Sequence, residues 1–238
     1  MIRALDVATS LLATVARGAS GLSVRAPGAR PEKTLELYEF ESCPYCRKVR
    51  EALSILDLEA MIHPCPKGGT RFRALVKARG GKEQFPWLVD PNSGEALYES
   101  DEIVRYLFER YGDGRVPALL AGGLLTDASS ALASAFRPGL GTRRRASRAP
   151  EQALELWSFE ASPFCRIVRE VLCSLELRYR LHNVAKNSPS RAAFVERSGR
   201  MMVPWLVDPN TGVEMFESAG IVAYLEETYA VRGGGAAA

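Results

Sequence analysis

An internal repeat constrains the fold of this 238-residue chain more than any other feature. Residues 37–47 (LYEFESCPYCR) return as residues 156–166 (LWSFEASPFCR), an offset of 119 positions. Residues 86–94 (PWLVDPNSG) return as residues 204–212 (PWLVDPNTG), an offset of 118, so one gap after the second predicted strand reconciles the two copies. Such a period is too long for a solenoid and indicates two homologous domains.

Both copies predict the same order of elements from their hydrophobic periodicity. In the first copy we expect strands at 35–40, 59–63, 86–90 and 95–98, and helices at 44–57, 70–79 and 100–111. In the second we expect strands at 154–159, 178–184, 204–208 and 213–216, and helices at 163–176, 189–198 and 218–229. A βαβ unit followed by a hairpin and a helix is typical of a mixed sheet with flanking helices. We therefore predict an α/β protein with two tandem domains, 34–114 and 151–230, each with a four-stranded sheet.

Residues 1–33 are rich in Ala, Ser, Arg and Leu and contain only Asp6 and Glu32 as acidic residues. This composition is typical of an organellar transit peptide, and composition alone does not separate plastid from mitochondrion. The alternative is an ordered N-terminal helix, with Leu5, Leu12, Val15 and Ile2 on one face.

Residues 115–150 form the predicted linker between the domains. Its first part has rough helical spacing of Val116, Leu119, Leu120, Leu124, Ala128, Ala131 and Ala135. We expect an amphipathic helix there and a flexible Pro/Gly/Arg stretch at 138–150. The helix either packs on a domain or makes a peripheral membrane contact, and the absence of Lys and Arg from its polar face favours packing.

Charge and composition exclude several classes of protein. A net charge of +3 is too small to indicate nucleic-acid binding. No apolar stretch is long enough for a transmembrane helix. Five cysteines in a chain of this length do not form a disulfide-stapled secreted scaffold. The tail at 231–238 is predicted to be disordered.

The Cys-Pro-Tyr-Cys motif at 43–46 lies where a predicted strand ends and a helix begins. Pro44 suits the first helical turn. Cys43 then faces free N–H groups and the positive end of the helix dipole, which stabilise a thiolate. Cys46 lies one turn further on and can attack a mixed disulfide on Cys43, so both are candidate catalytic residues. A metal site would require more ligands, and only His63 and Cys65 are nearby, so we expect no metal; a cluster bridged between two chains is a minor alternative.

The strand, the dithiol motif, the helix and a later proline at a strand start resemble the thioredoxin fold of glutaredoxins and of the N-terminal domain of glutathione transferases. The two-unit pattern with Phe-Pro-Trp-Leu-Val-Asp-Pro-Asn and Glu-Ser resembles a plant and algal plastid family that carries tandem glutathione-transferase N-terminal-like domains. The resemblance covers about 34–112 and 151–230. It implies a chloroplast location, with the mitochondrion as the alternative, and glutathione as cosubstrate.

The resemblance implies glutathione-binding residues in both domains. Pro86 and Pro204 match the cis-proline that faces the active-site loop. Phe85 and Val203 precede them and would pair with the cysteinyl backbone of glutathione. Tyr45, between the two cysteines, would also contact glutathione.

The duplicated Glu-Ser pair matches the residues that bind the γ-glutamyl end. Ser100 and Ser218 begin helices whose N–H groups can hold a carboxylate. Glu99 and Glu217 can attract the α-amino group. The alternative is that both serines are helix caps only.

The second domain departs from the dithiol pattern. Ser162 stands in place of Cys43, and Cys165 matches Cys46. A dithiol mechanism is therefore excluded there, and Ser162 either donates a hydrogen bond to a glutathione thiol or belongs to a degenerate binding unit. In the first domain, Glu41 is expected to raise the pKa of Cys43.

Three hypotheses of function remain. The first is a glutathione-linked thiol–disulfide oxidoreductase acting on protein disulfides or glutathionylated proteins. The second is a glutathione transferase. The second thioredoxin-like unit counts against it, because transferases have a helical domain at that place in the chain. The third is a non-enzymatic scaffold or assembly factor.

Overall fold

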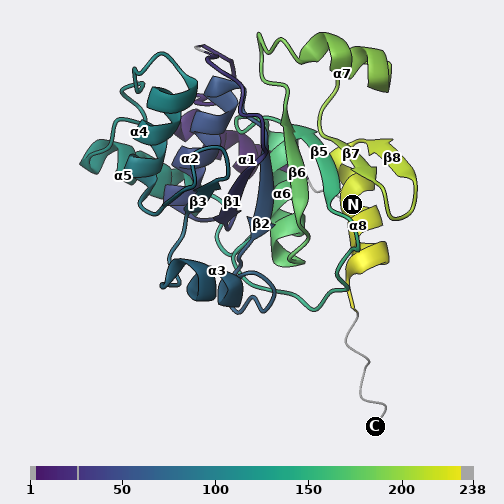
Figure 1. Ribbon diagram of the computed structural model, residues 1–238. Helices are drawn as coiled ribbons and strands as arrows, with labels where there is room; N and C mark the ends of the chain where they lie inside the picture. The colour runs from purple at the N-terminus through teal and green to yellow at the C-terminus, as the bar shows by residue number, and fades with distance from the viewer. Residues whose placement is uncertain (1–3, 26, 232–238) are drawn as a thin grey trace.

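The structure is a computed structural model that describes residues 4–25 and 27–231. The first unit contains β1 (Leu35–Glu39), α2 (Pro44–Leu56), β2 (Ala60–Pro64), α3 (Arg73–Gly80), β3 (Trp87–Asp90), β4 (Glu95–Leu97) and α4 (Ser100–Tyr111). The second contains β5 (Leu154–Ser158), α6 (Pro163–Ser174), β6 (Tyr179–Asn183), α7 (Arg191–Ser198), β7 (Trp205–Asp208), β8 (Val213–Phe216) and α8 (Ser218–Tyr229). Helices α1 (Ala4–Ala16) and α5 (Leu124–Ala135) precede the two units (Figure 1). The predicted α/β class and order of elements are confirmed.

The two predicted sheets are halves of one sheet. Its eight strands run in the order β4-β3-β1-β2-β6-β5-β7-β8. Strands β2 and β6 pair antiparallel at its centre, with Ile62 opposite Tyr179 (Figure 1). This pairing removes two exposed strand edges, each of which would otherwise present unpaired N–H and C=O groups. The repeat alone did not predict it, because a sequence repeat does not indicate which edges of two sheets meet.

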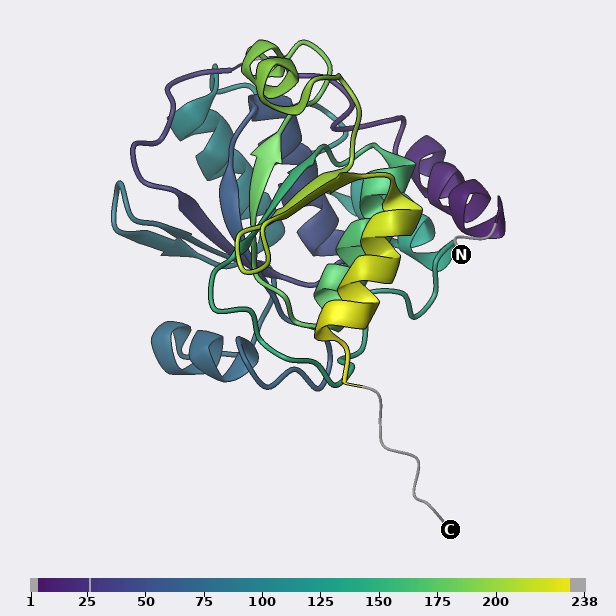
Figure 2. The ribbon, with the colours of Figure 1, turned by 90° about the vertical axis from the view of Figure 1, so that its right-hand side faces the viewer.

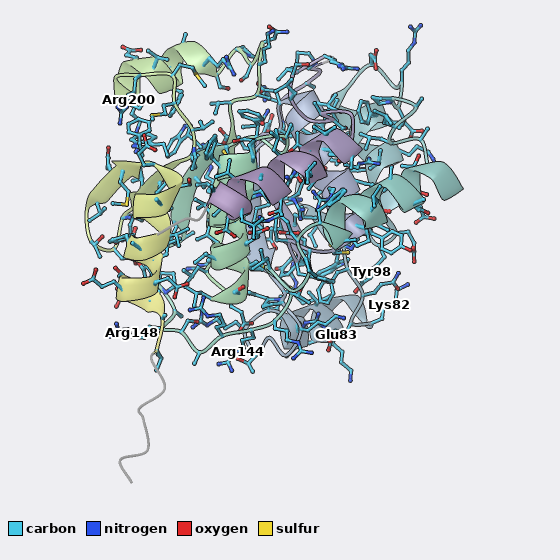
Figure 3. All side chains as sticks on the ribbon, turned by 180° about the vertical axis from the view of Figure 1, so that it is seen from behind. Lys82, Glu83, Tyr98, Arg144, Arg148 and Arg200 are labelled. Carbon is cyan, nitrogen blue, oxygen red and sulfur yellow. The ribbon has the colours of Figure 1, made fainter. Side chains whose placement is uncertain are left out.

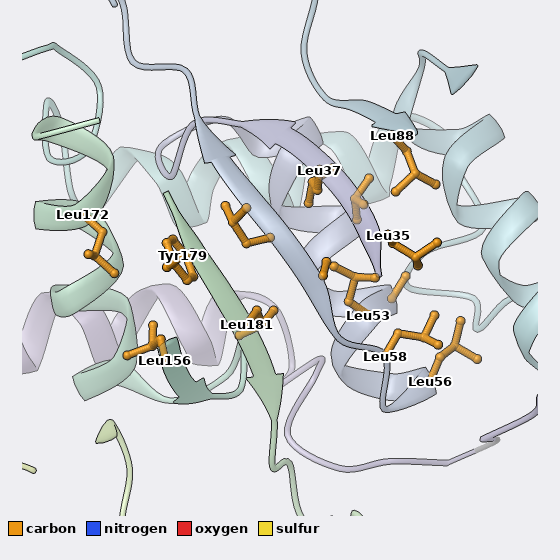
Figure 4. Close-up of a cluster of buried hydrophobic side chains, with 14 of the residues drawn as sticks. Leu35, Leu37, Leu53, Leu56, Leu58, Leu88, Leu156, Leu172, Tyr179 and Leu181 are labelled. Atoms are coloured by element: carbon orange, nitrogen blue, oxygen red, sulfur yellow. The ribbon is translucent and has the colours of Figure 1, made fainter. Parts of the chain in front are cut away.

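One cluster of buried apolar side chains crosses the central pairing. In the first unit Leu37 and Leu53 belong to it, and in the second Leu156 and Leu172 do (Figure 4). Since the core is shared, the two units form one body. No helix among the described residues is long and apolar enough to cross a membrane.

The repeat extends into the N-terminal segment. Helices α1 and α5 occupy equivalent positions at an offset of 120, and each covers the start of a helix in the other half of the repeat. Ser10 Oγ donates a hydrogen bond to Pro163 O (2.9 Å), and Ser130 Oγ donates one to Pro44 O (2.7 Å). From behind, α1 (purple) and α5 (teal) lie side by side on the outer face (Figure 3). The structural repeat is therefore longer than the predicted domains and comprises 4–112 and 124–230.

Helix α1 is ordered, but its predicted apolar face does not point inward. Leu5, Leu12 and Val15 are 69%, 48% and 66% exposed, whereas Ser10 and Ala13 are fully buried. Small residues face inward because the helix approaches the main chain of α6 closely. Ile2 lies outside the described residues. Organellar targeting by residues 1–33 stays a prediction.

The stretch at 138–150, expected to be flexible, is held by main-chain hydrogen bonds. Lys67 N donates to Thr142 O (2.7 Å), and Arg144 N donates to Lys67 O (3.0 Å). The equivalent N-terminal bonds join Lys186 to Leu22 and Val24. Each of these two segments thus lies across the opposite unit and is hydrogen-bonded to it. Only Val231 of the predicted disordered tail is described.

Buried charges join the units reciprocally. Arg50 Nε donates to Glu160 Oε2 (3.0 Å), and its repeat counterpart Arg169 donates from Nε to Glu41 Oε2 (3.1 Å). All four side chains are at most 3% exposed. Each buried arginine is thus compensated by the glutamate that precedes the helix of the other unit. Removing either arginine would take a buried charged partner from the glutamate of the other unit.

Candidate active site

Cys43 is the N-cap residue of α2. Its backbone is extended, with φ −70° and ψ 123°, and its Sγ accepts a hydrogen bond from Cys46 N (3.4 Å). Pro44 starts the helix, as expected from the sequence. Cys43 is only 4% exposed and Cys46 is fully buried, and both are free thiols. The fold therefore places the two sulfurs at one helix start.

The two thiols differ in their affinity for a proton. The hydrogen bond from the Cys46 thiol lowers the pKa of Cys43, helped by the N–H groups of Cys46 and Tyr45 and opposed by burial and the charge of Glu39. Burial first, and then its hydrogen bond to Cys43, raise the pKa of Cys46 well above its usual value. The arrangement favours a thiolate at Cys43 and a neutral thiol at Cys46.

The pKa of Cys43 is lowered, whereas the sequence predicted that Glu41 would raise it. Glu41 is ion-paired with Arg169 and also lies 3.4 Å from Arg50 Nη2, so its charge is compensated. Glu39, two residues earlier, is the acid that opposes the Cys43 thiolate. Burial raises the pKa of Glu39 itself to about 7, despite its ion pair with Arg50.

The cis-proline loop lies beside the cysteine loop. The Phe85–Pro86 and Val203–Pro204 bonds are both cis. The Phe85 ring makes an edge contact with Phe40, three residues before Cys43, at 6.3 Å between centroids. The structure therefore brings the predicted Phe85–Pro86 segment next to the strand that leads to the thiol.

The Glu-Ser turns adopt an unusual geometry in both units. Glu99 and Glu217 occupy the N-cap positions of α4 and α8 with φ of 62° and 70°, and neither side chain caps its helix. Ser100 and Ser218 are the first helical residues, so they are not the caps that the alternative interpretation required. Backbone strain of this kind occurs preferentially at functional sites. The first-turn N–H groups lack a side-chain cap and can receive a carboxylate.

Two contacts join the three parts of the first site, which are the start of α2, the cis-proline loop and the Glu-Ser turn. Lys48, on the first turns of α2, forms an ion pair with Asp101, the neighbour of Ser100. Gln84, the neighbour of Phe85, donates a hydrogen bond to Glu99. Tyr45 is 49% exposed beside the buried Cys43.

The second site repeats the geometry without the sulfur. Ser162 caps α6 with φ −71° and ψ 119°, and its Oγ accepts from Cys165 N (3.3 Å). Cys165 is fully buried, and burial raises its pKa. This site can bind or donate a hydrogen bond, but it holds no dithiol.

The remaining cysteines and histidines do not form a metal site. No group of potential ligands occurs among the described residues. The His63 ring stacks on Tyr38 at 4.3 Å, and burial raises the pKa of Cys65. Cys173 is buried, but its Sγ also donates to Gly141 O (3.2 Å) and accepts from Glu41 N (3.4 Å).

Sequence reasoning missed the residues that cover Cys43. Ser130 of α5 bonds to Pro44 O, and Thr142 Oγ1 donates to Ser42 Oγ (2.7 Å). The repeat of Ser10 as Ser130 and of Arg17 as Arg137 was the signal that could have revealed this cover.

Comparison with known families agrees with the geometry. The family described as "Glutathione S-transferase, N-terminal domain" matches residues 37–115 and 156–233. The chain belongs to this family. One copy of this domain is accordingly present in each unit, and the family supports a glutathione-related function.

Other comparisons add little. Leishmania TDR1, described as a trimeric glutathione transferase, is 15% identical, with 84% of this chain and 68% of that chain covered at a TM-score of 0.30. A likeness this distant carries no argument about function. The search of curated proteins finds no match.

Proposed function

We propose that the protein is a glutathione-linked thiol–disulfide oxidoreductase that uses Cys43 and Cys46. The observation that carries this proposal is the N-cap position of Cys43, whose Sγ accepts a hydrogen bond from Cys46 N at the helix start that also holds the buried Cys46 thiol. A thiolate stabilised in this way is both a nucleophile and a good leaving group.

The chemistry proceeds in two exchanges. The Cys43 thiolate attacks one sulfur of a substrate disulfide, forms a mixed disulfide and releases the other sulfur as a thiolate that takes up a proton. Cys46 then loses its proton and attacks Cys43 Sγ, which releases the second substrate thiolate. Two glutathione molecules reduce the resulting Cys43–Cys46 disulfide and become glutathione disulfide.

Glutathione binding would use the three connected parts of the first site. The main chain of Phe85 would pair with the cysteinyl unit, and the uncapped start of α4 at Ser100 would hold the γ-glutamyl carboxylate. In the second unit, Val203 and Ser218 would bind the same groups, with Ser162 facing the thiol. Without a sulfur there, the second unit would act as a binding unit.

The decisive test compares two cysteine variants in reduction of a glutathionylated peptide. Cys43→Ser is expected to lower the rate at least a thousandfold, because the nucleophile is lost. Cys46→Ser is expected to keep the first exchange and to accumulate a mixed disulfide at Cys43, visible by mass spectrometry. Cys173→Ser is the matched control, since it removes a buried thiol outside the site.

Two results would favour the other hypotheses. Conjugation of a model electrophile to glutathione that survives Cys43→Ser would indicate a transferase. Full complementation of a null strain by Cys43→Ser would indicate a scaffold, consistent with the cover over Cys43.

A further inference from the structure

Helices α1 and α5 form an outer layer over the two helix starts that hold the caps. Figure 2 shows α1 (purple) on the outside of the molecule, away from the sheet, and α5 packs on both α1 and α2. The cap residues Cys43 and Ser162 are each only 4% exposed under this layer. A substrate disulfide needs more room than that at Cys43, so part of the cover has to move before thiol exchange.

The cover over the second site is bonded to both sides of the cap. Besides the bond from Ser10 to Pro163 O, Thr14 Oγ1 of α1 donates to Ala161 O (3.0 Å). Arg166 Nη1 donates in turn to Ser10 O (2.6 Å) and to Thr14 Oγ1 (3.0 Å). Helix α1 is therefore fixed to the loop before the cap, to the loop after it and to the first turns of α6.

The cover over the first site lacks most of these bonds. Ser130 Oγ donates to Pro44 O, as Ser10 does in the other half. Ser134 stands at the position of the α1 threonine, and its Oγ receives only Arg47 Nη2, at 3.4 Å. Arg47 Nη1 lies 3.7 Å from Glu160 Oε1 and donates no hydrogen bond to the described residues of α5. Within the described chain, α5 is thus hydrogen-bonded to the cysteine loop at Pro44 alone.

The other polar contacts of α5 are weak or can be left behind. Lys48 Nζ lies 3.0 Å from Asp127 Oδ1, and the Asp127 side chain is 39% exposed, so solvent screens this pair. Arg17 Nη1 donates to Ser129 Oγ (2.5 Å) and to a main-chain carbonyl of α5 (3.2 Å). Arg17 also forms a buried bidentate pair with Glu51, which holds it in place without α5.

Little apolar surface holds α5 against the protein. Between residues 126 and 135 the buried side chains are Thr126, Ser130 and Ala133, whereas Leu132 is 53% exposed. Burial of such small side chains stabilises a contact less than burial of a leucine does. Gly123 precedes the helix with a φ of 104°, and glycine changes its backbone angles more freely than any other residue.

We propose that α5 is a lid over Cys43 that opens about its C-terminal end, whereas α1 is a fixed cover over Ser162. The anchor of the lid is Arg137, which follows the helix and forms the buried bidentate pair with Glu170. Opening breaks the bond of Ser130 to the cysteine loop and exposes Cys43 to a substrate disulfide. The inference rests on the proposed function, because it concerns access to the thiol that this function uses.

The test measures how fast a reagent reaches Cys43 in the reduced, full-length protein. Ser130→Ala removes the bond between α5 and the cysteine loop, so alkylation of Cys43 by iodoacetamide should become about three- to tenfold faster. Ser10→Ala removes the equivalent bond of α1 and is the matched control, with no change expected at Cys43. Mass spectrometry of the digests measures the rates. Cys173, a buried thiol outside the lid, reports any general loosening of the fold and should react equally slowly in all variants.

A second pair of variants uses the two acids that share Lys48. Asp127 belongs to the lid and Asp101 to α4. Asp127→Asn should make alkylation of Cys43 about two- to fivefold faster, because it removes an ion pair that keeps the lid closed. Asp101→Asn should not make it faster, because it leaves Lys48 to Asp127. The pH of half-maximal alkylation should stay the same in Ser130→Ala, since a shift would mean that the pKa of Cys43 had changed and not its accessibility.

Three outcomes would overturn the lid. The first is an equal rate at Cys43 in wild type, Ser130→Ala and Asp127→Asn. The second is equal acceleration by Ser130→Ala and Ser10→Ala, or acceleration at Cys173 as well, which would indicate a general loss of packing. The third is acceleration that comes entirely from a shifted pH profile. None of these depends on turnover, so the lid can fail while reduction of a glutathionylated peptide still supports the proposed function. Gated alkylation in a protein without that reductase activity would retain the lid and reject the function.

Discussion

The two units hold the same cap geometry with different chemistry. Cys43 and Ser162 have nearly equal backbone angles, and each accepts a hydrogen bond from the N–H three residues on. The geometry therefore does not depend on the sulfur, whereas nucleophilic exchange does. Around this common frame, the first unit has an acid at Glu39 where the second has Ser158, and it has Asp101 where the second has Ala219.

The largest expected effect concerns the reciprocal ion pairs that join the units. Arg169→Met removes one partner of Glu41 and one partner of Glu160, so the free energy of unfolding should fall by about 3–5 kcal/mol. Denaturant titration measures it. Arg180→Met, which breaks a half-exposed pair with Glu59, should cost less than about 1 kcal/mol. Equal losses of stability in the two variants would contradict the conclusion that the buried ion pairs join the units.

A second prediction uses the asymmetry between Glu39 and Ser158. Because burial raises the pKa of folded Glu39 to about 7, the folded state binds more protons than the unfolded chain between about pH 4.3 and 7. This contribution to stability is present below pH 4.3 and is lost as pH rises through 7. Glu39→Gln should reduce the loss of stability between pH 5 and pH 8 by roughly 2–3 kcal/mol.

Chemical denaturation at the two pH values measures this effect. Glu95→Gln, at an exposed position of β4, is the control. An unchanged difference between pH 5 and pH 8 in Glu39→Gln would show that Glu39 is already charged at pH 5.

A third prediction compares the two Glu-Ser turns. The first turn of α4 carries Asp101 and Glu102, whereas that of α8 carries no acid. Acidic residues there oppose a bound carboxylate, so Ser218→Ala should weaken glutathione binding about five- to tenfold, a loss near 1 kcal/mol. Ser100→Ala should have a smaller effect. Isothermal titration calorimetry distinguishes the two, and the reverse order would make the first unit the better binding site.

The smallest expected effect comes from placing a sulfur at position 162 of the second unit. Ser162→Cys places a thiol at the cap of α6, where the N–H of Cys165 lowers its pKa. Its alkylation by iodoacetamide at pH 7 should be a few-fold faster than that of the buried Cys165. Cys43 in the same digest is the reference for mass spectrometry. A new thiol that stays unreactive while Cys43 reacts would show that α1 blocks the second site more than α5 blocks the first.

Local sequence determined the elements and the caps. Alternating and helical periodicity predicted each strand and helix of both units, because these patterns report which face of one element is buried. The position of Cys43 at a helix start followed from its preceding strand and from Pro44. The cis-prolines and the Glu-Ser turns were predicted from the resemblance to a known family. Their backbone conformation involves only residues that are close together in the chain.

Tertiary structure decided which of these parts meet. The β2–β6 pairing, the crossing of α1 and α5, and the compensation of Glu41 by Arg169 all join residues far apart in the chain. The exposed leucines of α1 show why periodicity fails there, since its buried side is chosen by close approach and hydrogen bonds and not by apolarity. Charge effects depend on distance in space, which the sequence does not give. The sequence therefore indicated Glu41 as the acid that acts on Cys43, whereas in the folded chain Glu39 opposes the Cys43 thiolate.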